Sequence, residues 1–232
     1  MEREIKMMHR ELKVNYKTFY SLCNWLITCI YFTLGIQKNI IDTEFENVQK
    51  KMPAHEVRRH HLPHTHDITV NYIHSYKSQV IKKAIWRMKY NNDKRYIELF
   101  GNQLSEHINK QINKDDLTFI IPVPSTPQRL RIRGMWTTRD LAQIASRNIK
   151  KSILNTASLS RKDSPKQSHH TRAHKRISAI QNIYFTHKPE MLVGKNIICI
   201  DDVSTTGATL ADIRRVCKDA GCASFTCWVI AD

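Results

Sequence analysis

The chain has 232 residues, of which 41% are hydrophobic, and this allows one substantial α/β domain and a smaller N-terminal segment. The formal net charge of +16 favours polyanionic partners such as nucleic acid, anionic membrane or polyphosphate substrates, although a lineage-wide bias toward Lys would produce the same charge. The six cysteines have no disulfide or zinc spacing, which argues against a four-cysteine zinc module and is typical of a reducing compartment.

Residues 18–37 contain no charged residue and have the length that a membrane-spanning helix requires. Polar residues such as Asn24 and Thr28 interrupt the apolar sequence, so a buried amphipathic helix or a helix on the membrane surface competes with a true span. Acidic residues near the N-terminus, and the lack of a small-residue cleavage site, argue against a cleavable secretory signal. We therefore expect a cytoplasmic protein and leave membrane association through residues 18–37 open.

Residues 38–66 are predicted to form a linker or a loosely packed subdomain, which divides the chain into an N-terminal extension, 1–66, and a folded domain, 67–232. This segment contains a histidine cluster formed by His55, His60, His61, His64 and His66. Histidines at such short spacing can bind a transition metal, whereas a mixture of Arg, His and Pro is also typical of a solvated loop. The zinc content of the purified protein would separate these two interpretations.

Alternating apolar and polar residues predict a strand over residues 68–76. Two helices are predicted after it, at 78–89 and 96–109, with a turn between them at Asn91–Asp93. The first helix has a basic outer face that carries Lys82, Lys83, Arg87 and Lys89. Such a face is typical of a solvated surface, and it also suits contact with nucleic acid.

An Ile-rich run at 118–123 predicts a central parallel strand, which ends at Pro124. Arginines follow at positions 129, 131 and 133, and in a strand-like segment they would share one side, where guanidinium groups match phosphate oxygens. A surface basic patch is the alternative interpretation. A helix is predicted at 138–150, and the polar segment at 160–176 is typical either of a functional lid or of a disordered linker.

The most informative motif begins at Ile197, where an apolar strand leads into Asp201 and Asp202, a hydroxyl-rich loop and a helix at 210–220. The backbone N–H groups of Thr206 to Thr209 would point at an anion at the helix N-terminus, where the helix dipole favours negative charge. The two carboxylates suit ribose hydroxyls or a metal ion. A further strand at 223–231 completes an alternation of strands and helices that predicts a parallel sheet.

This motif resembles the phosphoribosyl pyrophosphate (PRPP) motif of type I phosphoribosyltransferases. Within that family, residues 68–232 resemble the ComF subgroup, because segments similar to 72–90, 121–134 and 159–184 occur there in the same order. The resemblance implies an α/β fold of the type I phosphoribosyltransferase kind. Its central, mostly parallel sheet is flanked by helices, and here an N-terminal helical extension precedes it.

The resemblance also implies a set of site residues and Mg²⁺ as the cofactor. In this family the two acids contact the ribose hydroxyls and act in catalysis, and Mg²⁺ arrives with PRPP and can contact the same acids. The ribose and 5-phosphate would be bound by Asp201, Asp202, Ser204, Thr205, Thr206, Gly207, Ala208 and Thr209; the pyrophosphate loop would contain Pro124, Ser125, Thr126, Arg129 and Arg133; and the flexible lid would contain Arg161, Gln167, Arg172 and Arg176.

The ComF subgroup usually opens with a four-cysteine zinc module, which the cysteine spacing of this chain does not provide. The chain departs from the family at three further points. The segment Gly134–Thr137 replaces the Gly-Phe-Asn-Gln that commonly follows the Arg-rich segment, and Ala179 stands where an Asn is expected. Thr205 stands where purine-base enzymes carry an Asp that assists the base. These departures concern the acceptor side of the site.

The function implied by the resemblance is that of a ComF-like phosphoribosyltransferase-domain protein that binds PRPP and acts in DNA uptake or natural transformation. One alternative is a non-catalytic module that binds single-stranded DNA, or regulates, and retains the phosphoribose pocket. Another is a nucleobase-salvage phosphoribosyltransferase, a function in nucleotide metabolism. The acceptor is left open, as is the oligomeric state, with a homodimer among the candidates.

Overall fold

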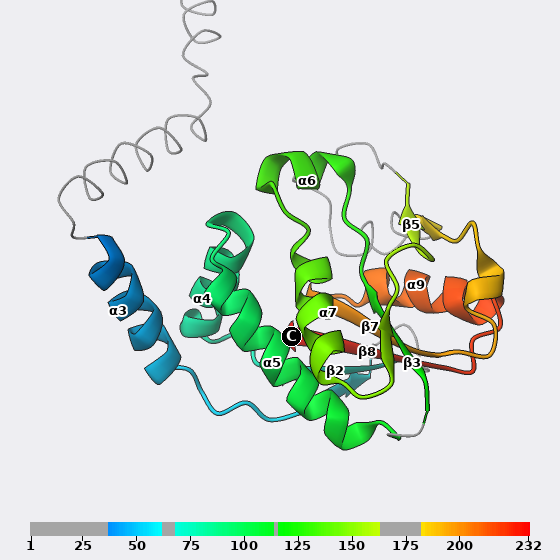
Figure 1. The fold of residues 1–232 in the computed structure, drawn as a ribbon, viewed down its shortest axis with the longest axis horizontal. Coiled ribbons are helices and arrows are strands. Elements are labelled where there is room, and N and C mark those ends of the chain that lie inside the picture. The colour runs from blue at the N-terminus through cyan, green and yellow to red at the C-terminus, as the bar shows by residue number, and fades with distance from the viewer. Residues whose placement is uncertain (1–36, 62–67, 114–115, 163–181) are drawn as a thin grey trace, which may run out of the picture. The chain divides into compact units, whose positions relative to one another are not determined.

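The structure is a computed structural model that describes residues 37–61, 68–113, 116–162 and 182–232 (Figure 1). The chain divides into two compact units, Met1–Lys51 and Met52–Asp232. In the first unit the described residues belong mainly to helix α3 (Gln37–Lys50), and the predicted apolar helix at 18–37 lies outside them except for its last residue. Within the described ranges, no helix combines the length and apolarity needed to cross a membrane.

The second unit is built on a six-stranded sheet with the strand order β1-β2-β8-β7-β3-β4. Its strands are β1 (Arg58–His61), β2 (Thr69–His74), β3 (Thr118–Pro122), β4 (Ser152–Leu154), β7 (Asn196–Val203) and β8 (Ser224–Ala231). Neighbouring strands are parallel except for β1 and β2, which are antiparallel. The predicted α/β class, with a central, mostly parallel sheet flanked by helices, is confirmed.

Helices cover both faces of this sheet (Figure 1). The helices of this unit are α4 (Gln79–Tyr90), α5 (Lys94–Gln111), α6 (Pro127–Arg133), α7 (Thr137–Asn148) and α9 (Ala208–Asp219), with a short 3-10 helix, η1, at Pro189–Met191. On one face, α7 packs against β3 and β7, and α5 packs against α7. Gly101 permits this close approach, because a Cβ there would lie 2.7 Å from Cγ2 of Ile144. The other face packs against α9.

Strand β7 is buried on both sides because helices cover both faces of the sheet. Its side chains alternate between these two faces. Ile197 and Cys199 belong to the same buried cluster as Leu210 and Ile213 of α9. The intervening residues of β7 therefore face the α7 side of the sheet. This alternation continues to the end of the strand, so the adjacent acids of the motif point to opposite faces.

A second, two-stranded antiparallel sheet is formed by β5 (Ser160–Arg161) and β6 (Tyr184–Phe185). Strand β5 lies at the start of the segment 160–176, which was predicted to be a lid or a linker, and β6 lies beyond its end. Residues 163–181, between these strands, lie outside the described residues.

The strand-like conformation predicted for residues 129–133 is wrong, because they belong to helix α6. Thr126 caps this helix by accepting a hydrogen bond from Arg129 N–H at 3.1 Å, and Pro127 at the first position fits the helical φ. Gly134 ends the helix in the left-handed conformation, with φ of 71°. In a helix, residues 129 and 133 share a face and residue 131 lies on another.

Residues 38–61, the described part of the segment predicted to be a linker or a loosely packed subdomain, contain regular elements. They contain most of α3, and β1 pairs with β2 at the edge of the main sheet. The edge position explains why the sequence pattern missed this strand. An edge strand has no need of an apolar run, and the four residues of β1 are two arginines followed by two histidines.

Candidate functional site

A cavity of about 240 Å³ lies at the carboxyl ends of β3 and β7, where parallel sheets characteristically bind ligands. Its walls come from α4, α6, the segment between α6 and α7, and both strands of the small sheet. The lining residues are Lys89, Val123, Pro124, Ser125, Arg129, Arg133, Met135, Trp136, Thr137, Thr138, Arg161, Tyr184, Asp201, Asp202, Val203 and Thr209. The cavity thus gathers residues from segments that are distant in the sequence.

The two adjacent acids at the end of β7 have different surroundings. Asp202 is buried on the α7 side and forms an ion pair with Lys89 of α4, with Nζ 2.7 Å from Oδ1. Asp201 faces the α9 side and accepts a hydrogen bond at 2.8 Å from the backbone N–H of Asp202. One carboxylate is therefore neutralised by a fixed cation, while the other is available to a ligand.

Asp201 is a strongly perturbed acid. Burial raises its pKa to about 7, and the negative charge of Asp202 adds to this rise. The Asp202 N–H and the positive charges of Lys89 and Arg129 act in the opposite direction but do not cancel it. Asp201 is therefore partly protonated near neutral pH, and a ligand cation or a pair of hydroxyl donors would favour its ionised form.

Four cationic side chains line the cavity: Lys89, Arg129, Arg133 and Arg161. Arg129 and Arg133 lie one turn apart on α6, which directs both to the same side. The Arg133 guanidinium also lies 5.3 Å from the ring centre of Tyr90 on α4. With two acids and four cations, the lining favours a polyanionic ligand.

Some buried polar atoms have no hydrogen-bond partner among the described residues, and three of them lie at or beside the cavity: Thr137 Oγ1, Arg161 Nε and Ser204 Oγ. Such atoms are rare, because an unsatisfied buried donor or acceptor costs free energy. Thr137 and Arg161 line the cavity, and Ser204 directly follows β7. These atoms are therefore suitable contacts for a ligand.

The hydroxyl-rich loop after β7 leads into α9 through a left-handed glycine. Gly207, with φ of 68°, stands at the N-cap and offers no side chain to the first N–H groups of the helix. Ser204 is anchored through its backbone N–H, which donates to the Ala231 carbonyl at 3.1 Å. The loop thus has a defined backbone and a helix N-terminus suited to an anion. Of its residues, Thr209 reaches the cavity lining, whereas Thr205 is exposed.

Tyr184 joins this loop to the small sheet. Its hydroxyl is hydrogen-bonded to the Thr209 side chain, and burial raises its pKa to about 12, so it is neutral. The Arg161 guanidinium lies 5.5 Å from the centre of the Tyr184 ring. Tyr184 therefore contacts both Arg161 of β5 and Thr209 in the first turn of α9.

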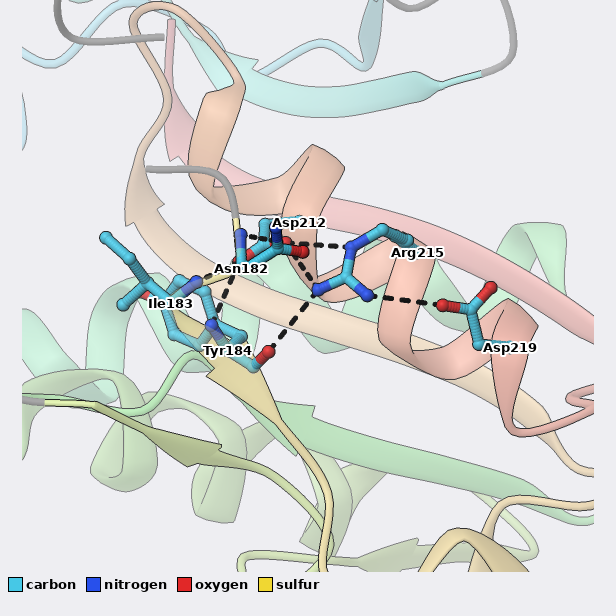
Figure 2. Close-up of polar contacts among 6 residues, drawn as sticks. All are labelled: Asn182, Ile183, Tyr184, Asp212, Arg215 and Asp219. Carbon is cyan, nitrogen blue, oxygen red and sulfur yellow. Dashed lines mark hydrogen bonds and ion pairs between the residues drawn. The ribbon is translucent and has the colours of Figure 1, made fainter. Parts of the chain in front are cut away.

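A buried carboxylate on α9 holds Tyr184 in place (Figure 2). Asp212 accepts hydrogen bonds from three consecutive backbone N–H groups, those of Asn182 at 3.1 Å, Ile183 at 2.8 Å and Tyr184 at 2.9 Å. Arg215 donates to the same carboxylate through Nε at 3.1 Å and through a terminal nitrogen at 2.8 Å. This cluster fixes β6 against α9 and is not part of the sequence prediction.

The segment after α6 fixes the end of β3. Trp136 donates its indole N–H to the Val123 carbonyl at 3.0 Å, and Thr138 donates its hydroxyl to the same oxygen at 2.8 Å. Trp136 belongs to the segment that departs from the family pattern. Its role here is to hold the start of the loop that contains Pro124 and Ser125.

A known protein resembles the chain over much of its length. Competence protein ComFC of Bacillus subtilis (strain 168) is 28% identical over 153 residues, which are 64% of this chain and 60% of that protein. The predicted resemblance to ComF proteins is confirmed. The matched residues cover 60% of ComFC, which is less than two thirds of its length. No protein-family model matches the chain.

Two solved structures are similar to the chain at low identity. Hypoxanthine-guanine phosphoribosyltransferase of L. donovani is 10% identical with a TM-score of 0.37, and the match covers 60% of this chain and 72% of that one. The corresponding enzyme from Leishmania tarentolae, in complex with GMP, is 11% identical with a TM-score of 0.33 over 58% and 65% of the two chains.

Eight of the seventeen residues that the resemblance singled out line the cavity. The cavity is lined by Pro124, Ser125, Arg129, Arg133, Arg161, Asp201, Asp202 and Thr209. Thr126 caps α6 instead. The loop after β7 and the first residue of α9 lie next in the chain to these cavity residues and contain Ser204, Thr205, Thr206, Gly207 and Ala208. Gln167, Arg172 and Arg176 lie outside the described residues.

Of the five histidines considered for metal binding, His55 is the one whose side-chain contacts the structure describes. Its Nδ1 lies 2.7 Å from Nε2 of His107 on α5, and its ring centroid lies 6.2 Å from that of His74 on β2. His64 and His66 lie outside the described residues. In the part of the chain that the structure describes, no group of three or more His, Cys, Asp or Glu residues is placed to hold a metal ion.

Proposed function

We propose that the chain is a phosphoribosyltransferase-like ComF protein that binds PRPP with Mg²⁺ and acts in DNA uptake during natural transformation. The observation that carries this proposal is the arrangement at the end of β7. Two adjacent acids there face a cavity that contains four cationic side chains. Hydroxyl groups and concentrated negative charge, the two features of PRPP, match these two groups of residues.

The ribose and its 5-phosphate are assigned to the β7 side of the cavity. Asp201 accepts hydrogen bonds from ribose hydroxyls, a role that suits an acid with no ion pair among the described residues. The 5-phosphate is assigned to the loop from Ser204 to Thr209, where backbone N–H groups at the start of α9 and the unsatisfied Ser204 hydroxyl donate to it. Thr209 is already positioned by Tyr184.

The pyrophosphate is assigned to the opposite side, near α6. Arg129 and Arg133 share one helix face there, and guanidinium groups bind phosphate oxygens through paired hydrogen bonds. Ser125 lies in the loop that Trp136 and Thr138 hold at Val123. Arg161 adds an unsatisfied Nε and a positive charge above the ribose.

The residues present fit Mg²⁺. This ion is usually bound by one or two carboxylates together with substrate phosphates, and two carboxylates stand at this position. Asp201 is the more available ligand, because Asp202 is paired with Lys89. When bound, Mg²⁺ neutralises negative charge on the departing pyrophosphate.

The reaction class is displacement of pyrophosphate from ribose C1 by a nucleophile. The C1–O bond to pyrophosphate breaks, a bond from C1 to the acceptor forms, and positive charge develops on the ribose in between. The acids at the end of β7 stabilise that charge, and the arginines of α6 stabilise the leaving group. Because the acids and the arginines lie in one cavity, they also hold the ribose and the pyrophosphate in the orientation that the reaction needs.

Purine salvage is the less favoured version of this activity. Thr205 occupies the position where purine-base enzymes of the family carry an Asp, and its side chain is exposed. A base that assists the acceptor would therefore come from another residue or from the acceptor itself. A non-catalytic protein would bind PRPP in the same way but would release no pyrophosphate.

The test is a pair of measurements on the purified chain. Thermal unfolding is followed with PRPP and Mg²⁺, with ribose 5-phosphate, and without ligand. We expect PRPP to raise the midpoint, since saturation at about 100 Kd stabilises the folded state by about 2.7 kcal/mol. Pyrophosphate release is then followed with candidate acceptors. No stabilisation by PRPP would overturn the proposed binding, whereas binding without pyrophosphate release would support the non-catalytic alternative.

The role in DNA uptake rests on the relationship to ComFC and has its own test. The chain is expressed in Bacillus subtilis from which ComFC has been deleted, and transformation frequency is measured. We expect partial restoration by the wild-type chain and none by the Asp201→Asn variant. Equal frequencies with the wild-type chain and with an empty vector would contradict this role.

A further inference from the structure

Lys89 joins the last turn of α4 to the acids at the end of β7. Its Nζ lies 2.7 Å from Oδ1 of Asp202, and both side chains are largely shielded from water. The last turn of a helix favours a cation, because the helix dipole is negative at that end. Lys89 also lines the cavity at the carboxyl ends of β3 and β7. The chain therefore places one of its own cations in contact with both an acid and the cavity.

The ammonium group of Lys89 keeps hydrogen-bond donors for a ligand. A lysine ammonium has three rotatable N–H donors. Asp202 is the only partner of Nζ among the residues that the structure describes. Because the side chain lines the cavity, the two remaining donors can point at ligand oxygens while the ion pair stays intact.

The end of α4 lies beside the arginines of α6. Tyr90 follows Lys89 in the chain, and the Arg133 guanidinium lies 5.3 Å from the centre of the Tyr90 ring. Arg129, which shares a helix face with Arg133, lines the same cavity as Lys89. Lys89 therefore borders both groups of charged residues, the acids of β7 and the arginines to which the pyrophosphate is assigned.

Two adjacent acids repel a polyanion unless cations lie close to them. In many phosphate sites Mg²⁺ supplies this positive charge, held by carboxylates together with substrate phosphates. At Asp202 the ammonium of Lys89 already neutralises the carboxylate, since only 2.7 Å separates Nζ from Oδ1. Asp201 has no ion pair among the described residues, and it remains the acid to which Mg²⁺ is assigned. The cavity thus needs a metal ion at one acid rather than at two.

We propose that Lys89 is a built-in cation of this cavity. It donates to pyrophosphate oxygens while it stays paired with Asp202, so the pyrophosphate group binds without Mg²⁺. This inference rests on the proposed function and adds a ligand-binding residue to it. A lysine suits the role, because its compact charge contacts a carboxylate and a phosphate oxygen at the same time. Mg²⁺ then strengthens PRPP binding through Asp201 but is not required for it.

The test is isothermal titration calorimetry of the full chain with inorganic pyrophosphate and with PRPP in the presence of EDTA. We expect saturable binding by the wild type. The Lys89→Met variant should lose about tenfold or more in affinity, because a hydrogen bond from a charged donor is removed. Lys89→Arg keeps a cation and should retain more affinity than Lys89→Met. Ribose 5-phosphate lacks the pyrophosphate group, so Lys89→Met should change its affinity less than that of PRPP.

The matched control is Lys82→Met, which removes the same charge from the same helix. Lys82 Nζ lies 5.6 Å from the centre of the Tyr76 ring, and the side chain does not line the cavity. This variant should bind pyrophosphate as the wild type does. Thermal unfolding shows which variants are folded at the titration temperature, and the wild-type titration in EDTA decides the question even where Lys89→Met does not fold. Added Mg²⁺ should restore part of the PRPP affinity of Lys89→Met, because the metal then supplies the missing charge.

Three outcomes would overturn this role of Lys89. They are pyrophosphate binding by the wild type only when Mg²⁺ is present, equal affinity of the wild type and Lys89→Met in EDTA, and equal losses in Lys89→Met and Lys82→Met. PRPP binding that requires Mg²⁺ would overturn this role alone and leave the proposed function intact. Absence of PRPP binding even with Mg²⁺ would overturn the proposed function and the role of Lys89 with it.

Discussion

Lys89 Nζ lies 2.7 Å from Asp202 Oδ1, and this ion pair joins helix α4 to the end of strand β7. The two side chains are only 16% and 11% exposed, so the pair is largely shielded from water. It explains how β7 can end on two adjacent acids without a bound ligand, since one of the two negative charges is already neutralised. A ligand cation that reaches Asp202 must compete with Lys89 or share the carboxylate with it.

Replacing Lys89 with Met should lower the free energy of unfolding by up to about 3 kcal/mol. The substitution leaves the shielded Asp202 carboxylate without its cation and next to Asp201. Urea unfolding at pH 8 measures the change. The control is Lys77→Met, an exposed lysine in the turn before α4, which should change stability by less than about 0.5 kcal/mol. Equal stabilities of the two variants would show that the ion pair contributes little.

The stability difference between the Asp201→Asn variant and the wild type should depend on pH, because the pKa of Asp201 is raised in the folded protein. Because the folded-state pKa is raised from 3.8 to about 7, the folded protein binds the Asp201 proton more tightly than the unfolded chain. The wild type therefore loses stability through this group as pH rises from about 4 to about 7. The Asn variant lacks this loss, so its stability relative to wild type should increase between pH 5 and pH 8. A pH-independent difference would argue against the raised pKa.

Ligand binding should depend on pH in the opposite direction. Ribose hydroxyls and Mg²⁺ interact with the ionised Asp201 carboxylate, and below the pKa of about 7 each pH unit should weaken PRPP affinity by up to about tenfold. Titrations with PRPP at pH 6, 7 and 8, all at the same ionic strength, would measure this change in affinity. Affinity that stays constant over this range would exclude Asp201 as a ligand in its ionised form.

Replacing Asp212 with Ala should destabilise the fold by about 3–5 kcal/mol, because three backbone N–H groups and Arg215 lose their buried acceptor. The same change should weaken PRPP binding, since Tyr184 and Thr209 lose their support. Asp219→Ala is the control: Asp219 also pairs with Arg215, but its side chain is 66% exposed, and the expected cost is below about 1 kcal/mol. Similar losses in both variants would contradict this account of the cluster.

Two histidines should make the fold sensitive to acid. Burial lowers the pKa of His74 and of His107, and the neighbouring His55 lowers both further. The unfolded chain therefore binds more protons than the folded chain, and stability is lost as pH falls through the ordinary value of 6.5. The difference in unfolding midpoint between wild type and His74→Gln should narrow from pH 7.5 to pH 5.5. A constant difference would show that His74 does not titrate on unfolding.

The elements of the sheet could be predicted because their patterns are local. An apolar run that stops at two acids places the end of β7, and apolar stripes place α4, α5 and α7 within a few residues. The α6 helix was missed because a run of arginines at alternate positions has no apolar stripe, although Thr126, Pro127 and Gly134 are helix boundary residues. Read together, these boundary residues predict the α6 helix.

The supporting residues of the site could not be predicted because their partners are distant in the sequence. Lys89 lies outside the apolar stripe of its helix, so it was assigned to a basic face, and its pairing with Asp202 depends on how α4 packs. Asp212 stands beside Ile213 on the buried side of α9, which is an unusual place for an acid and was the available signal. Tyr184 ended a segment that resembled the family, but nothing local connects it to Thr209.

We expect Asp201 and Asp202 to form the ligand side of a PRPP site, and isothermal titration calorimetry with PRPP and Mg²⁺ measures this binding. The wild type and Asp219→Ala should bind PRPP saturably. The Asp201→Asn, Asp202→Asn double variant should show no detectable binding, and its single-stranded DNA affinity should stay unchanged or rise slightly. Absence of PRPP binding by the wild type, or equal binding by the wild type and the double variant, would contradict this expectation.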